Sequence, residues 1–261
     1  MASVQGAGHI VETKLMVFRR LWKANILSSF FQPLFYLLAM GIGVGSLVNQ
    51  NASSTEMLGG VTYVQFIAPG LLATTAMVVA TVESTWPVLS GFRWDRTYVA
   101  QSATPLDATD IVTGHFVWIA IRVAIAATAV AAVMAIIPAT RSSGLLLAVI
   151  FAVLTGVSIG MPTAAYAATR QNDGGFAAFQ RFVVTPLLLF GGAFFPTSQL
   201  PAWLQPIAEI TPLWHGVELC RGASLHTLEL WPTIGHIAYL LLWTVVGTIL
   251  ASRLFTRRLA T

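Results

Sequence analysis

Six long apolar runs dominate the sequence, and they constrain the fold more than any other feature of the chain. An α-helix needs about 20 predominantly apolar residues to cross the hydrocarbon core of a bilayer, so each run is a candidate transmembrane helix. The runs cover residues 26–48, 61–82, 111–137, 144–168, 182–195 and 233–255. The fifth run is short for a full crossing, because Pro186 interrupts it and Gly191 and Gly192 lie near its end. The pattern predicts an all-α polytopic membrane protein with six transmembrane helices.

The composition agrees with this class and excludes others. Only 9% of the 261 residues are charged, whereas soluble domains have about 25% charged residues. The excess of 14 Lys and Arg over 10 acidic residues is first a topology signal in a membrane protein, so we expect no nucleic-acid partner. A single cysteine, Cys220, excludes an intrachain disulfide and a Cys-rich metal site. We expect no metal ion or other cofactor bound by this chain.

The distribution of Lys and Arg predicts the orientation of the chain, because cytoplasmic loops are enriched in these residues. They gather before the first run, between the second and third, between the fourth and fifth, and after the last. Six crossings put all four of these segments on one side of the membrane. The exceptions are Arg122, which lies inside a run, and Arg141 and Arg221. We therefore predict that both termini are cytoplasmic and that segment 196–232 lies outside the cell.

Residues 84–110 form a polar segment between the second and third runs, in which charged and aromatic side chains alternate. A loop that is merely solvated does not need this mixture, whereas a short amphipathic helix pressed against another protein does. The residues that we assign to this contact are Trp86, Phe92, Arg93, Trp94, Asp95 and Arg96. The sequence thus predicts a cytoplasmic helix at which force from a partner protein enters the membrane-embedded chain.

Two further segments are predicted to lie at the membrane surfaces. Residues 9–25 combine basic with aliphatic and aromatic side chains, which is typical of a helix lying in the interface plane on an anionic leaflet. An ordinary charged flank is the alternative. In segment 196–232, prolines separate short apolar pieces, and its tryptophans suit the headgroup layer. We predict two short re-entrant helices there, beginning near Pro201 and Pro212.

Arg122 lies about ten residues, or roughly 15 Å of helix, inside the third apolar run. A charge at that depth is costly and requires a partner or water. Glu83, at the cytoplasmic end of the second run, is the nearest candidate by depth. The two residues form either a polar contact in a translocation path or a structural ion pair, and Arg122 can also snorkel to the interface.

Catalytic motifs are almost absent. No Gly-Lys pair exists, so the chain has no phosphate-binding P-loop and no ATPase motif of its own. Residues 156–160 (GVSIG) match the serine-hydrolase pattern, with Ser158 as the nucleophile. That motif requires a strand-to-helix turn, whereas this one lies inside a helix-length apolar run where small residues favour close helix packing. We favour packing, and an intramembrane serine hydrolase is the alternative.

Four short pieces of the chain carry a family resemblance. They are FIAPGLLA at 66–73, ATPL at 103–106, FGGAFFP at 190–196 and LP at 200–201. In this order, with six apolar runs and the aromatic, charged segment, they resemble the membrane subunits of type-2 ABC exporters. The similarity is greatest to the nodulation-factor and daunorubicin exporter permeases, and it extends over nearly the whole chain.

The resemblance implies one transmembrane domain over residues 1–261, assembled as two permeases on two ATP-binding subunits that hold the ATP and Mg²⁺. It places the family's coupling helix near 85–98, its interfacial helix at 9–25 and its outer re-entrant helices at 196–232. It puts the substrate path at the permease–permease interface, near the first, second and fifth runs. The residues that we assign to this path are Phe35, Phe66, Phe190, Arg122 and Glu83.

The function expected from this resemblance is export of a hydrophobic or amphiphilic substrate, such as a drug or antibiotic, a lipid or a glycolipid. The chain would lie in a bacterial cell membrane as a transport subunit without catalytic residues, in contact with lipid and with a second permease. A scaffold subunit that does not transport is a further alternative.

Overall fold

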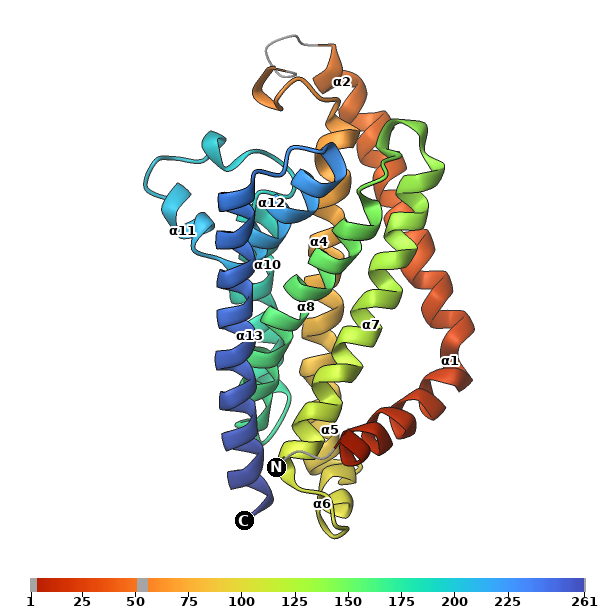
Figure 1. Ribbon diagram of the computed structural model, residues 1–261, viewed down its shortest axis with the longest axis vertical. Coiled ribbons are helices and arrows are strands. Elements are labelled where there is room, and N and C mark those ends of the chain that lie inside the picture. The colour runs from red at the N-terminus through yellow and green to blue at the C-terminus, as the bar shows by residue number, and fades with distance from the viewer. Residues whose placement is uncertain (1–3, 51–55, 261) are drawn as a thin grey trace.

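The computed structural model describes residues 4–50 and 56–260, and for residues 4, 21–30, 32, 33 and 42 only the backbone. Every regular element in these ranges is a helix, so the all-α prediction is confirmed. Figure 1 shows an elongated bundle whose long helices run along one axis. Both ends of the chain lie at the same end of the bundle as α5 and α6, and α2, α11 and α12 lie toward the opposite end.

The elements follow one another as α1 (Val4–Leu38), the π-helix η1 (Ala39–Val44), α2 (Gly45–Asn49), α4 (Tyr63–Ser84), α5 (Trp86–Arg93), α6 (Thr97–Ser102), α7 (Ala108–Ile136), the 3-10 turn η2 (Pro138–Thr140), α8 (Leu145–Ala168), α9 (Gly174–Phe179), the π-turn η3 (Gln180–Val184), α10 (Thr185–Phe190), the 3-10 turn η4 (Thr197–Gln199), α11 (Gln205–Glu209), α12 (Pro212–Leu225) and α13 (Leu230–Leu259). Helix α8 occupies the centre, where α4, α7, α12 and α13 all pack against it.

Four helical stretches of the described residues are long and apolar enough to cross a membrane: Tyr63–Arg93, Ala108–Ile136, Leu145–Ala168 and Leu230–Leu259. They coincide with the second, third, fourth and sixth predicted runs. The predicted interfacial segment and the first run are joined without a break in α1, which crosses the end of the bundle obliquely before it turns along α7 (Figure 1). The described structure thus has one bent helix where the sequence suggested two.

The fifth run differs from its predicted limits of 182–195. A shorter apolar helix covers Gly174–Phe190, with η3 just before Pro186, whose missing N–H leaves an α-helical hydrogen bond unmade. The helix ends when Gly191 N–H donates to Leu187 O (2.8 Å). Gly192 then takes a left-handed φ of 76°, which glycine adopts at no steric cost.

The polar segment 84–110 contains two short helices, α5 and α6, where one amphipathic helix was expected. Helix α7 begins at a capping box, in which the Asp107 side chain accepts from the backbone of Asp110 and Asp110 accepts from Asp107 N–H (3.1 Å). Of the two predicted outer helices, α12 begins at Pro212 as expected. The other, α11, begins at Gln205 rather than near Pro201, because Pro206 occupies its first turn.

Small residues bring the helices together. A Cβ added to Gly156 would lie 2.8 Å from Val123 Cγ2 of α7 and 3.0 Å from Ala76 O of α4. A Cβ added to Gly70 would lie 2.6 Å from Ala193 O, so α4 touches the backbone that follows α10. Two of the pieces that carry the resemblance, 66–73 and 190–196, therefore meet in space.

Gly70→Ala should destabilise the folded chain by about 1–3 kcal/mol, because the new methyl group meets a backbone carbonyl that cannot move aside independently. Thermal unfolding of the purified protein in detergent measures the effect. Gly235→Ala is the matched control, because nothing lies within 4 Å of its added Cβ and alanine favours a helix. Equal unfolding temperatures for the two variants would contradict the close approach.

Candidate functional site

The turn between α5 and α6, residues 94–96, projects from the end of the bundle that holds both termini (Figure 1). Trp94 is 56% exposed, and Arg93, Asp95 and Arg96 are exposed beside it. The Ser90 hydroxyl donates to the Asp95 carboxylate, and Asp95 N–H donates to Ser90 O (3.0 Å). A large aromatic side chain among charges is therefore held out on a hydrogen-bonded turn.

Phe92 points in the other direction and packs inside the chain. Its ring centroid lies 5.0 Å from that of Tyr98 on α6 and 4.8 Å from that of Phe255 on α13. The Arg258 guanidinium carbon lies 4.4 Å from the centroid of Phe92, and Arg258 Nη1 donates to Ala168 O at the end of α8 (2.7 Å). A cation suits the negative end of a helix. A movement of Phe92 would therefore be transmitted to α13 and, through Arg258, to α8.

Trp86, the first residue of α5, contacts a different helix. Its ring stands edge-on to Phe176 of α9, with the centroids 5.5 Å apart, and Phe176 is buried. Helix α5 therefore contacts the helix that corresponds to the fifth run as well as α8 and α13. A displacement of the 94–96 turn would therefore be transmitted through α5 to several helices at once.

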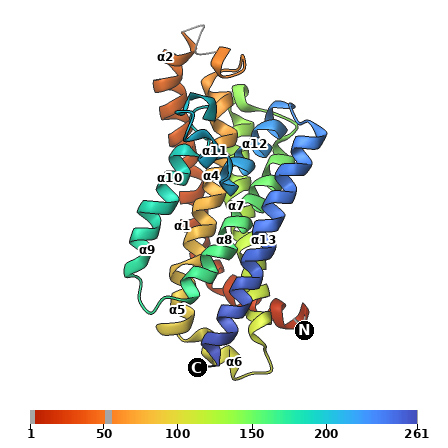
Figure 2. The same cartoon turned by 90° about the vertical axis from the view of Figure 1, so that its left-hand side faces the viewer.

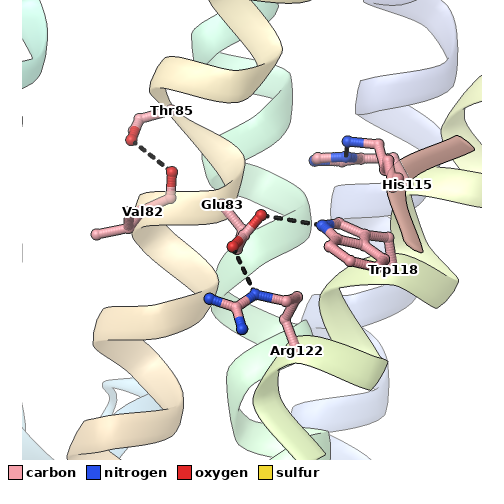
Figure 3. Close-up of polar contacts among 7 residues, drawn as sticks. Val82, Glu83, Thr85, His115, Trp118 and Arg122 are labelled. Carbon is pink, nitrogen blue, oxygen red and sulfur yellow. Dashed lines mark hydrogen bonds and ion pairs between the residues drawn. The ribbon is translucent and has the colours of Figure 1, made fainter. Parts of the chain in front are cut away.

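Glu83 lies one residue before the end of α4 and pairs with α7 (Figure 3). Arg122 Nε donates to Glu83 Oε1 (2.8 Å), and Trp118 Nε1 donates to Glu83 Oε2 (3.0 Å). The Arg122 and Glu83 side chains are only 12% and 16% exposed. The predicted pairing of Arg122 with Glu83 is confirmed, and it ties α4 to α7 just above α5.

Helix α1 completes this polar cluster. Phe18 stands against the Trp118 ring (6.0 Å between centroids) and lies 4.7 Å from the Arg122 guanidinium carbon. Lys14 Nζ lies 3.3 Å from His115 Nδ1 on α7. Lys14 thus points into the protein, whereas the sequence indicated a basic side chain facing lipid headgroups.

The three aromatic residues assigned to the substrate path have different surroundings. Phe35 is 63% exposed on α1, and Phe66 is only 4% exposed on α4. Phe66 lies under Arg221 of α12, whose guanidinium carbon is 3.9 Å from the ring centroid. Arg221 Nη2 donates to Gly192 O (2.7 Å) and Nη1 to Glu218 (2.6 Å), so Phe66 belongs to an internal contact that joins α4, α12 and the bend after α10.

Phe190 is partly exposed and lines a cavity of about 590 Å³ between α8, α10, α11 and α13. In the view of Figure 2, α8 lies between α10 on one side and α13 on the other. The walls are almost entirely apolar. The two threonines in them, Thr163 and Thr211, donate their hydroxyl protons to Ile159 O and Ala208 O (2.7 Å each). The cavity therefore suits an apolar ligand.

Ser158 lies in the middle of α8, is fully buried, and donates to Thr155 O (2.8 Å). The strand-to-helix turn that exposes a hydrolase nucleophile is not found here, because residues 145–168 form one helix. Residues 156–160 therefore lie in a helix, where Gly156 allows close packing against α4 and α7, as the sequence favoured. Among the described residues, no group of three or more His, Cys, Asp or Glu side chains could hold a metal ion.

Sequence reasoning missed Arg258, Arg221 and Lys14 as contact residues. It counted the two arginines only in the assignment of topology, and it assigned Lys14 to the interfacial segment. The sequence contained a signal for the contact of Arg258. Phe255 and Arg258 are three residues apart and share a face at the end of α13, opposite an aromatic segment that needed partners. No comparable pattern marks Arg221 or Lys14.

Comparisons with known proteins agree with this architecture. The family model described as ABC-2 type transporter matches residues 8–225. Nodulation protein J of Rhizobium leguminosarum bv. viciae is 34% identical over 255 residues, which cover 94% of each chain. Nodulation protein J of Rhizobium meliloti (strain 1021) is 32% identical over 91% of this chain and 89% of that protein. The inner membrane transport permease YadH of Escherichia coli (strain K12) is 23% identical over 88% of this chain and 90% of that protein.

Proposed function

The chain belongs to the ABC-2 type transporter family, and on that premise we propose that it is the permease subunit of an ATP-driven exporter for hydrophobic or amphiphilic substrates. The observation that carries this proposal is the 94–96 turn. It exposes Trp94 among charged side chains, while buried contacts behind it reach α4, α8 and α13. Such a turn suits a groove on an ATP-binding partner subunit.

The proposed orientation puts the 94–96 turn and both termini in the cytoplasm. The last turn of α13 supports this choice, because it carries Arg257 and Arg258 and cytoplasmic flanks are rich in basic residues. Helices α11 and α12 then lie at the outer surface, where we propose that they dip into the outer leaflet as re-entrant helices. We further propose six crossings, with α1 and the α9–η3–α10 helix as the first and fifth, and a second permease that completes the substrate path.

The proposed mechanism begins with the closure of the ATP-binding subunits, which pushes on the 94–96 turn. Helix α5 transmits this push to α4 through the backbone, to α13 through Phe92 and Phe255, and to α8 through Arg258. The Glu83–Arg122 ion pair makes α7 follow α4. The bundle tilts as a unit, and the substrate path changes from inward to outward access.

The substrate proposal depends on apolar surface. Phe35 and Phe190 are exposed aromatic side chains on α1 and α10, and Phe190 continues into the apolar cavity between α8 and α13. A preformed apolar cavity of several hundred Å³ with few polar groups is typical of a site for a hydrophobic ligand. We propose that the apolar part of the substrate, whether drug, lipid or glycolipid, contacts this surface during export.

Reconstitution tests the proposal directly. The full chain is placed in vesicles with and without its ATP-binding subunit, and ATP-dependent movement of a lipophilic fluorescent dye is measured. We expect movement only when both subunits and ATP are present. Movement by the chain alone would overturn the proposal, and stable assembly with the partner but no transport of dye or labelled lipid would favour a scaffold.

A further inference from the structure

A second cavity, of about 300 Å³, lies beside the Glu83–Arg122 pair, where α5 and α6 follow α4. Four elements enclose it: α1, the α4–α5 junction, α6 and α7. The side chains that matter for its chemistry are Lys14, Glu83, Tyr98, Gln101 and Arg122. The proposed transport mechanism uses the ion pair but leaves the cavity itself without a role.

Buried polar groups without partners line this cavity. The Tyr98 side chain is only 2% exposed, and neither its hydroxyl oxygen nor Gln101 Oε1 has a hydrogen-bond partner among the described residues. A buried polar atom without a partner is costly, so these two atoms offer hydrogen-bonding groups to a ligand that enters the cavity. Because an amide can be turned to present either oxygen or nitrogen, Gln101 can donate or accept there.

The charges at the cavity favour an anion. Both Glu83 oxygens are engaged, one by Arg122 and one by Trp118, so this carboxylate is already compensated. In the part of the chain that the structure describes, Arg122 donates through Nε alone, and Lys14 makes its one polar contact with the ring nitrogen of His115. The Lys14 ammonium therefore faces the cavity without a hydrogen bond to a carboxylate, although the charge of Glu83 acts on it, and the terminal nitrogens of Arg122 remain available.

We propose that this cavity binds a phosphate group, held by the Lys14 ammonium, the Arg122 guanidinium and the Tyr98 hydroxyl. Charge-assisted hydrogen bonds from Lys and Arg are the usual means of holding phosphate. Val17, Phe18 and Pro87 give the wall an apolar part, which suits the glycerol and first methylenes of a phospholipid. A bound phosphate would join α1 to α6, next to the 94–96 turn.

The phosphate can belong to a lipid headgroup or be a free ion, and the experiment distinguishes the two. Native mass spectrometry of the full chain in detergent measures binding of dioleoylphosphatidylglycerol, with dioleoylglycerol as the phosphate-free comparison. We expect a one-to-one adduct with the phospholipid that the neutral lipid does not form. Competition by inorganic phosphate would identify the free ion as a ligand, and its absence would identify the lipid. Equal binding of the two lipids would overturn the proposal.

Variants locate the site. Lys14→Gln should weaken binding at least about tenfold, because it removes a charge-assisted hydrogen bond. Tyr98→Phe removes only the hydroxyl and should weaken binding about three- to tenfold, which keeps the test valid if Lys14→Gln folds poorly. Arg19→Gln is the control, because it removes an exposed cation from the same helix. Equal losses for Lys14→Gln and Arg19→Gln would reduce the effect to surface charge and contradict the site.

Binding should also depend on pH through Lys14. Burial lowers the pKa of the Lys14 ammonium to about 8, and the nearby Glu83 carboxylate opposes this effect. The charged groups that face Lys14 are Glu83, Arg122 and, when protonated, His115, while burial and Glu83 raise the pKa of Tyr98, which stays a donor. Phosphate affinity should be full below pH 7 and fall as pH rises past about 8. A fall of the same size in Lys14→Gln would contradict this assignment.

The placement of this cavity at the cytoplasmic end of the bundle rests on the proposed function, but the binding assay does not. It uses the chain without its ATP-binding subunit and measures no transport. Loss of export in reconstituted vesicles would therefore leave the phosphate site standing, and loss of phosphate binding would leave the permease function standing.

Discussion

Export should fall to background in the double variant Arg93→Glu with Trp94→Ala, while membrane insertion and folding remain normal. Arg93, the last residue of α5, and Trp94, the first residue of the 94–96 turn, are both exposed, so their replacement opens no cavity in the core. Buried Trp and Arg anchors at protein interfaces each contribute at least about 2 kcal/mol to binding. Loss of even one such anchor weakens the contact with the ATP-binding subunit about thirtyfold. ATP-dependent dye movement in vesicles and co-purification of the two subunits measure the effect.

The matched control for this variant is Arg257→Glu. It makes the same charge change at an exposed position at the same end of the bundle, but away from the turn. We expect export by this control to stay within about twofold of wild type, because isolated surface charges contribute little. Normal export by the double variant, or an equal loss in both variants, would contradict the coupling role of the turn.

Glu83→Gln should destabilise the folded chain by about 3–5 kcal/mol, because it leaves Arg122 buried without its carboxylate. The double variant Glu83→Gln with Arg122→Gln removes both charges and should recover a large part of the loss. Thermal unfolding in detergent, analysed as a double-mutant cycle, measures the coupling between the two residues.

Glu12→Gln is the control for this second experiment, because Glu12 is an acidic residue in α1 whose side chain is 67% exposed. It should change stability by less than about 0.5 kcal/mol. If Glu83→Gln were as stable as this control, the ion pair would have no structural role. Loss of export without loss of stability would instead favour the alternative in which Arg122 and Glu83 act in the substrate path.

The parts of the fold that the sequence predicted correctly are those that one local rule decides. Apolar length located α4, α7, α8 and α13 to within a few residues. Pro212 marked the start of α12. Depth in the membrane was enough to choose Glu83 as the partner of Arg122.

The structure differs from the sequence prediction, or leaves it open, where a sequence pattern has two physical outcomes. An amphipathic segment shows that its aromatic side chains must be buried. It does not show whether a partner protein or another part of the same chain buries them. Phe92 was therefore assigned to the partner contact, and that assignment stays a prediction, while within this chain its ring packs on Phe255. Lys14 looked like a surface cation because its neighbours on α1 are basic, and only the bend of α1 against α7 turns it toward His115. The limits of the fifth helix depended on how the chain accommodates Pro186, which composition does not determine.

The central claim is that the 94–96 turn lies in the cytoplasm and is covered by the ATP-binding subunit, and cysteine labelling tests it most directly. Trp94→Cys places a thiol on the exposed turn, and the native Cys220 is buried and should not react. We expect a membrane-impermeant maleimide to label the variant in inside-out vesicles but not in intact cells, and the ATP-binding subunit to protect it. Labelling from outside intact cells, or equal labelling with and without the partner, would contradict the account.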